Sequence, residues 1–116
     1  MAHEKLPHHH GEKSEEVFEK IPPNEAFSQI AEVFSLLGDK TRAKIFWILS
    51  NCEDCVINIS AMTEMSSPAV MHHLKLLKMA GLIVSRREGK EVYYKAAETQ
   101  TSKMLYKALD DLMNLT

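Results

Sequence analysis

The sequence lacks any apolar run near the roughly 18 residues that a membrane-spanning helix needs, so we expect no membrane partner. Its first residues are polar and charged, without the apolar centre of a secretory signal, and we expect the chain to act in the cytoplasm. Cysteine is almost absent. Cys52 and Cys55 are the only two, and in a reducing cytoplasm we expect free thiols, available to a metal ion or an oxidant, and no structural disulfide.

The usual marks of an enzyme are also missing. The sequence has no glycine-rich phosphate loop, no nucleophile with an accompanying base, and no pair of acids suited to acid–base chemistry. The Cys-x-x-Cys spacing lacks the βαβ setting of a thioredoxin-like motif. These absences argue against an enzyme and against an organic cofactor.

What is present is a globular composition with an uneven distribution of charge. Of the 116 residues, 45% are apolar and 26% are charged, a balance typical of one domain. Residues 1–39 hold eight acids against three bases, a balance of −5, whereas residues 66–95 hold six bases against two acids, a balance of +4. The basic part is where the phosphates of a nucleic acid would be met.

Periodicity divides the chain into an arm and a domain. Residues 1–23 are polar, carry four histidines and end in two prolines, so we expect a mobile arm. In residues 24–116, apolar residues recur every three or four positions in several runs. Asn24 and Asp39 are suited to cap the first two helices and Gly38 to separate them, and Trp47 is expected in the core. The helices are predicted at residues 24–37, 39–50, 52–64 and 66–79, and from residue 98 onward.

The helix at 66–79 is the centre of the functional prediction. Ser66 precedes a proline, which suits an N-cap followed by a first-turn Pro. At 100° per residue, Val70, Leu74 and Leu77 share one face that packs inward. The opposite face is small, polar and cationic, as a major groove requires. The residues expected to meet DNA on this helix are Ser66, Ser67, Pro68, Ala69, Met71, His72 and Lys75.

After Gly81 the pattern becomes that of a β-hairpin. Residues 82–87 and 91–95 are rich in β-branched and aromatic residues, and a turn containing Gly89 joins them. Three basic residues near the tip, Arg86, Arg87 and Lys90, can neutralise phosphates. The last helix has a wider apolar stripe than one small domain needs, so it should pair with a second copy. The predicted fold is mainly α with a small β-hairpin: a winged helix-turn-helix, as a homodimer.

Three stretches together resemble the ArsR/SmtB family of metal-responsive bacterial repressors. They are Met65 to Lys78 (MSSPAVMHHLKLLK), Gly81 to Val84 (GLIV) and Arg87 to Tyr94 (REGKEVYY), and residues 37–42 (LGDKTR) are similar to the family's entry to its second helix. The resemblance implies a dimer that holds double-stranded operator DNA of inverted-repeat symmetry. It also implies that the repressor lets go when a metal ion binds.

The resemblance implies two candidate metal sites. Cys55 matches the thiolate at the start of the family's third helix, Cys52 is expected one helical turn before it, and the arm of the other protomer supplies further ligands in related members. Two thiolates with imidazoles would suit Zn(II) or Cd(II), with Pb(II) or Cu(I) as further candidates. The arm's candidate ligands are His8, His9, His10 and, more weakly, His3. At the second family site, the positions that match include Glu98 and Asp111 but no histidine, so it is only a weak alternative.

Two other functions stay open at this point. The thiols could make the same fold a sensor of oxidants or reactive sulfur, with no metal involved. The chain could also be a metal-buffering or protein-interaction module that binds no operator. His73 is expected at the edge of the packed face, and a metal role for it or His72 is disfavoured because neighbouring helical residues point in different directions.

Overall fold

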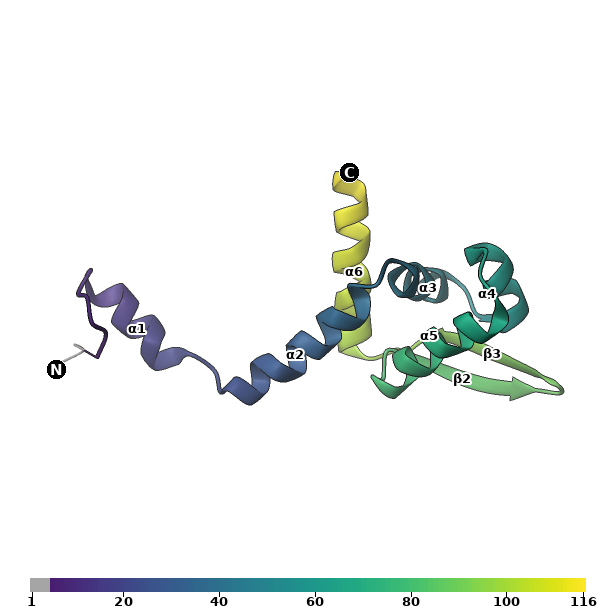
Figure 1. The fold of residues 1–116 in the computed structure, drawn as a ribbon, viewed down its shortest axis with the longest axis horizontal. Helices are drawn as coiled ribbons and strands as arrows, with labels where there is room; N and C mark the ends of the chain where they lie inside the picture. The colour runs from purple at the N-terminus through teal and green to yellow at the C-terminus, as the bar shows by residue number, and fades with distance from the viewer. Residues whose placement is uncertain (1–4) are drawn as a thin grey trace. The chain divides into compact units, whose positions relative to one another are not determined.

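The computed structural model describes residues 5–116 and divides the chain into two compact units, one ending at Glu32 and one covering Val33–Thr116. The elements, coloured along the chain in Figure 1, run α1-α2-α3-β1-α4-α5-β2-β3-α6. No helix among the described residues is long and apolar enough to cross a membrane. Their bounds are α1 Glu12–Lys20, α2 Asn24–Leu37, α3 Lys40–Asn51, β1 Asp54–Cys55, α4 Val56–Thr63, α5 Ser67–Met79, β2 Ile83–Glu88, β3 Glu91–Ala96 and α6 Gln100–Leu115.

The first unit contains a helix that the sequence analysis did not predict. Residues Glu12–Lys20 form α1 inside the stretch expected to be an arm. Its first turn carries Glu12 and Glu15 and its last turn carries Lys20, an order that favours a helix because it complements the helix dipole. The Glu15 carboxylate is buried and accepts a hydrogen bond from the backbone N–H of Lys5 at 2.9 Å. The mobility of residues 1–23 stays a prediction.

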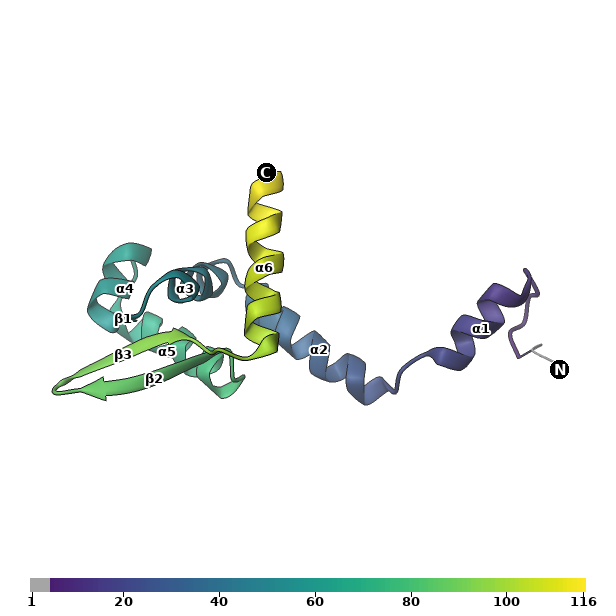
Figure 2. The same cartoon turned by 180° about the vertical axis from the view of Figure 1, so that it is seen from behind.

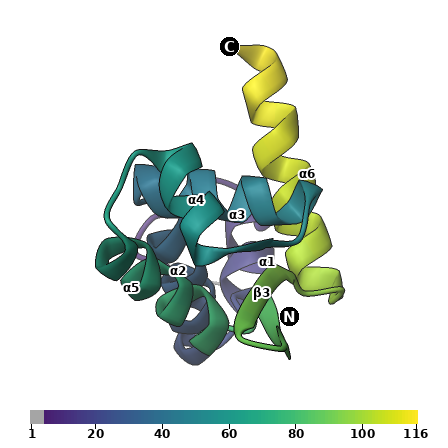
Figure 3. The ribbon, with the colours of Figure 1, turned by 90° about the vertical axis from the view of Figure 1, so that its right-hand side faces the viewer.

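The second unit is built around α3 and α5. Asp39 caps α3 as predicted, accepting from the backbone N–H of Arg42 at 2.9 Å. Helix α3 buries Ile45 and Phe46 against the inward face of α5 and against the sheet. Figure 3 shows α4 and α5 side by side, joined by a short turn in which Glu64 takes a left-handed conformation (φ 55°). Helices α4 and α5 are therefore the predicted helix-turn-helix.

The hairpin has a third strand that was not predicted. Strands β2 and β3 pair antiparallel, and the two residues of β1 add to the other edge of β3, so the strand order is β1-β3-β2. Gly89, with φ 63°, makes the tight turn at the tip. The hairpin projects beyond the helices, and β1 is visible beside β3 from behind (Figure 2). A winged helix-turn-helix is confirmed, with a wing of three strands.

Two predictions about α3 and its C-terminal end are wrong. The helix expected from residue 52 begins later: Cys52 is the C-cap of α3, whereas Cys55 lies in β1 and is the N-cap of α4, so only Cys55 stands at the start of a helix as predicted. The backbone there pairs with Tyr93 and Tyr94, a partner distant in sequence that no local pattern could reveal. Trp47 is not in the core, because 38% of it is exposed on the side of α3 away from Ile45 and Phe46.

Candidate nucleic-acid interface and thiol segment

Helix α5 presents the predicted face to solvent. Ser66 caps it, its hydroxyl accepting from the backbone N–H of Ala69 at 3.3 Å, and Pro68 stands in the first turn. Val70, Leu74 and Leu77 are fully buried. The burial fixes the helix from behind, so the opposite face is held outward. The exposed candidates are Ser66, Ser67, Pro68, Met71, His72 and Lys75, and Ala69 is half-buried.

His73 is more deeply placed than its sequence position indicated. It is 8% exposed, and its Nδ1 accepts a hydrogen bond from Arg42 Nε at 3.2 Å. Burial lowers the pKa of His73, and the guanidinium of Arg42 adds to this, while Asp39 opposes it. His73 is therefore a neutral acceptor that ties α5 to the start of α3, a role with no signal in the sequence pattern.

The two arginines of β2 lie on opposite faces of the wing, because side chains alternate along a strand. Arg87 follows Ser85 and shares its face, and Ser85 Oγ accepts from Lys78 Nζ of α5 at 2.7 Å. Arg87 is thus on the side of the recognition helix. Lys90 is exposed at the tip of the hairpin.

Arg86 is occupied by carboxylates. Its Nε and Nη2 donate to the two oxygens of Glu53 at 2.9 and 2.7 Å, and Nη1 donates to Glu88 at 2.9 Å. Its guanidinium carbon also lies 5.0 Å from the centre of the Tyr93 ring. These hydrogen bonds raise the pKa of Arg86 and lower that of Glu53. Arg86 is on the predicted list of phosphate contacts, but here its positive charge is already balanced.

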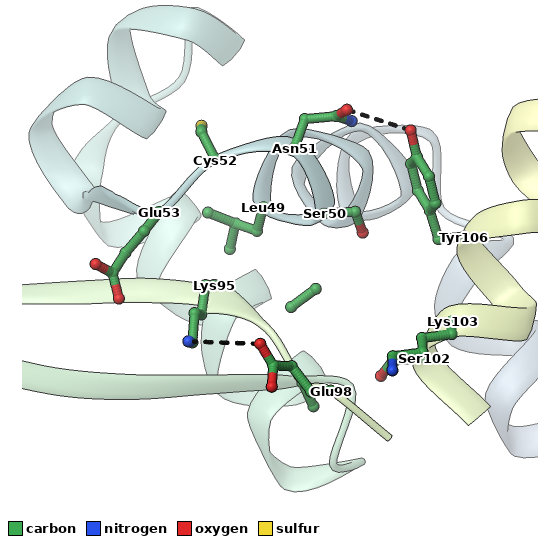
Figure 4. A pocket seen from close by; sticks show the side chains of 12 residues that line it. Leu49, Ser50, Asn51, Cys52, Glu53, Lys95, Glu98, Ser102, Lys103 and Tyr106 are labelled. Carbon is green, nitrogen blue, oxygen red and sulfur yellow. Dashed lines mark hydrogen bonds and ion pairs between the residues drawn. The ribbon is translucent and has the colours of Figure 1, made fainter. Parts of the chain in front are cut away.

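Residues Cys52–Cys55, the thiol segment, have extended backbone at both ends and include the strand Asp54–Cys55. Cys52 has φ −154° and ψ 161°, and Cys55 has φ −98° and ψ 167°. Alternation along such a chain puts Glu53 and Cys55 on one side and Cys52 and Asp54 on the other. Figure 4 shows the side chains of Cys52 and Glu53 leaving in opposite directions. Burial first, and the charge of Asp54 second, raise the pKa of Cys52.

The thiol segment carries two of the predicted metal ligands. Cys52 is exposed, Cys55 is half-buried, and both are free thiols, the donors that soft ions prefer. The intervening acids are engaged, Glu53 by Arg86 and Asp54 by the backbone N–H of Cys55 and the side chain of Asn58, each at 2.8 Å. Within residues 5–116 of this chain, no three His, Cys, Asp or Glu side chains come together as a metal site. The two thiols have the donor chemistry of a soft-metal site, but alternation along the segment directs their side chains to opposite sides.

The other predicted ligands stand as follows. His8, His9 and His10 are exposed in the first unit, with the rings of His8 and His10 stacked at 5.8 Å. His3 lies outside the described residues. Glu98 pairs with Lys95 at 4.0 Å and Asp111 pairs with Lys107 at 2.9 Å, so the weak second site consists of engaged surface carboxylates.

A polar pocket beside the thiol segment was not predicted. It lies between the end of α3, the end of β3 and the start of α6 (Figure 4). The hydroxyl of Tyr106 donates to Asn51 Oδ1 at 3.2 Å, and Ser102 Oγ donates to the buried carbonyl of Leu82 at 3.0 Å. These bonds dock α6 against α3 and against Leu82, the residue before β2.

Known proteins are similar to this chain over most of its length. Residues 39–85 match the family model described as "Bacterial regulatory protein, arsR family". A cadmium resistance transcriptional regulatory protein CadC homolog of Staphylococcus aureus is 40% identical over 80 residues, which are 68% of this chain and 66% of that protein. A transcriptional repressor SmtB homolog of Synechocystis is 31% identical over 103 residues, or 89% of this chain and 78% of that protein.

A solved structure agrees with these relatives. The homodimeric winged helix-turn-helix DNA-binding domain of Mb0332 from Mycobacterium bovis is 27% identical, with a TM-score of 0.69 over 78% of this chain and 83% of that one. It is described as a possible ArsR-family transcriptional regulator. Fold, family model and curated relatives agree, so the chain belongs to the arsR family of bacterial regulatory proteins and is a transcription regulator, not an enzyme.

Proposed function

We propose that this protein is a dimeric repressor that binds inverted-repeat operator DNA and is released when a soft metal ion binds Cys52 and Cys55. One observation carries the DNA-binding half: α5 is fixed by fully buried Val70, Leu74 and Leu77 and turns a face of small, polar and cationic residues outward. That face and the basic wing suit base edges and phosphates, respectively. Such a regulator acts where the DNA is, in the cytoplasm.

The dimer is supported by apolar side chains that one copy leaves exposed. They gather on α6, and Trp47 on α3 joins Met113 in lining an apolar groove between the two helices. A second copy would bury these surfaces, and the similar Mb0332 domain is described as homodimeric. The exposed apolar residues of α6 are Met104, Leu112, Met113 and Leu115.

Release by a metal ion, the second part of the proposal, is supported by the donor chemistry and by the names of relatives. Of the two free thiols, Cys55 lies within β1 and Cys52 lies two residues before it, and similar proteins are called a cadmium resistance regulator and an arsenical resistance operon repressor. Zn(II) and Cd(II) are the first candidates, followed by Pb(II) and Cu(I). The arm histidines His8, His9 and His10 are the proposed source of further ligands.

The test has two stages. Inverted-repeat sequences selected from random duplex DNA by the reduced, metal-free protein would define the operator, and fluorescence anisotropy would then follow release as each metal is added. We expect one of the four ions to weaken binding by about 5- to 150-fold, the usual range of coupling between two sites. The variant Cys52→Ser/Cys55→Ser should bind the same DNA and ignore the metal.

Three outcomes would change the proposal. Metal release that persists in the double serine variant would remove the thiols from the site. Release by persulfide or peroxide with no effect of any metal would favour the sensor of oxidants or reactive sulfur. Failure to select any inverted repeat would favour a metal-buffering or protein-interaction module. Substituting His8, His9 and His10 with alanine, with the cysteines intact, tests the arm separately.

A further inference from the structure

The thiol segment is part of the wing, not only its neighbour in sequence. Cys55 pairs with Tyr93 on one edge of β3, and Arg86 pairs with Tyr93 on the other edge. Residues directly opposite in antiparallel strands put their side chains on the same face. Cys55, Tyr93 and Arg86 therefore form one row across the sheet, with Glu53 beside Cys55 reaching Arg86.

This row is held by a clamp, the bidentate contact between Glu53 and Arg86. Two parallel N–H to carboxylate bonds at 2.9 and 2.7 Å fix the guanidinium in one orientation, and its position over the Tyr93 ring adds a cation–π contact. The side chain of Glu53 is 28% exposed and that of Arg86 is 50% exposed. The clamp is therefore at the surface, where a moderate force can open it.

The extended thiol segment cannot hold one ion with both sulfurs. Cys52 and Cys55 have extended backbone angles, and an extended segment at about 3.3 Å per residue would put their Cα atoms roughly 10 Å apart with the side chains on opposite sides. Two thiolates on one tetrahedral ion, each about 2.3 Å from the metal, bring their sulfurs within roughly 4 Å of each other. Joint binding thus requires the segment to leave its extended form, and Glu53 lies in the middle of it.

We propose that Glu53 and Arg86 form the link between the thiols and the wing, closed in the metal-free protein and opened when both cysteines bind one ion. Glu53 and Arg86 are positioning residues: the clamp holds the wing as the metal-free state needs it, and the rearranged segment withdraws Glu53 from Arg86. The inference rests on the proposed function, since it requires that Cys52 and Cys55 share an ion. Because coupling is reciprocal, a clamp that metal opens must also oppose metal binding.

The experiment measures Cd2+ affinity of the reduced full-length protein without DNA, by competition with a chelator. Arg86→Lys keeps the positive charge but loses the planar fork, and Glu53→Gln weakens the pair from the other side. Both should bind Cd2+ about three- to tenfold more tightly than wild type. The matched control is Glu88→Gln, which removes the other carboxylate from Arg86 but leaves the thiol segment attached, and its Cd2+ affinity should stay within about twofold.

A metal-free readout checks the clamp itself. Hydrogen exchange of the β1 and β3 backbone amides should be faster in Arg86→Lys and Glu53→Gln than in wild type, and unchanged at β1 in Glu88→Gln. Wild-type Cd2+ affinity and unchanged exchange in Arg86→Lys would overturn the inference and leave the proposed function intact. Weaker Cd2+ binding by Glu53→Gln alone would make Glu53 a ligand and also overturn it. A wild-type protein that does not bind Cd2+ through its thiols would instead refute the metal-binding function, and the inference with it.

Discussion

The recognition helix α5 and the thiol segment are held in place by different kinds of interaction. Helix α5 is fixed by three fully buried aliphatic side chains and by a hydroxyl cap at its start. The thiol segment is fixed by two paired residues of backbone and by polar side-chain contacts at the surface. Buried aliphatic packing is costly to disturb, whereas surface ion pairs are not. The surface proposed to meet DNA should therefore resist distortion, and the thiol segment should be easier to rearrange.

Leu74→Ala gives the largest expected effect and tests the rigid side of this comparison. Leu74 is 1% exposed in the centre of the core. Its truncation should lower the free energy of unfolding by about 2–5 kcal/mol, measured by urea unfolding of the metal-free protein. Met71→Ala on the same helix, 46% exposed, is the control and should change stability by less than about 0.5 kcal/mol. Equal effects from both would show that burial does not fix α5.

The same difference decides what the sequence could reveal. The signals for α5 are local: Ser66 before a proline, apolar residues every three or four positions, and Gly81 after the end. Asp39 as the cap of α3 is equally local. Such signals predicted most of the helical framework and the outward face of α5, because a helix satisfies its hydrogen bonds within its own segment.

The features that the sequence did not predict correctly depend on residues distant in the chain or on a misleading composition. The strand at Asp54–Cys55 exists because β3 offers it an unpaired edge, and the buried place of His73 depends on Arg42 of another helix. Trp47 lies on the one side of an apolar helix that one copy does not cover. Helix α1 has the polar, charged composition that is typical of a mobile arm, although the order of its charges favours a helix.

The two wing arginines sharpen the comparison at the level of DNA binding. Arg87→Gln should weaken operator binding and reduce the slope of log affinity against log salt by about 1, because one phosphate contact is lost. Arg86→Gln should leave that slope within about 0.3, because Glu53 and Glu88 already balance its charge in the metal-free protein. The measurement is fluorescence anisotropy over a salt series. An equal fall in slope for both variants would place Arg86 on the phosphates.

His73 extends the comparison to pH. Its folded pKa is below the ordinary value near 6.5, because burial disfavours the charged ring. Between the folded and unfolded pKa values the unfolded chain binds more protons, so stability should fall as the pH drops below about 6.5. Urea unfolding at about pH 7.5 and about pH 5.5 should show this loss in wild type.

Two histidine variants isolate that contribution. His73→Asn keeps a side-chain acceptor but cannot take up a proton, so its loss of stability on acidification should be smaller than that of wild type. His72→Asn, at the exposed neighbouring position, should lose as much as wild type. The lowered pKa of Asp39 does not interfere, because a carboxylate with that shift loses its contribution only at more acid pH. Identical behaviour of the two variants would assign the acid sensitivity elsewhere.

The smallest expected effect on stability is in the thiol segment. Cys52 is exposed, and among the described residues its thiol makes no hydrogen bond. Cys52→Ser should therefore change the free energy of unfolding by less than about 0.5 kcal/mol. Cys55 is half-buried beside Tyr93, and its serine variant should cost more than that of Cys52 yet far less than Leu74→Ala. Urea unfolding of both variants, reduced and metal-free, measures this. A loss of unfolding free energy in Cys52→Ser comparable to that in Leu74→Ala would mean that the thiol segment is as rigid as the recognition helix. A segment that rigid could not leave its extended form to bring two sulfurs onto one ion.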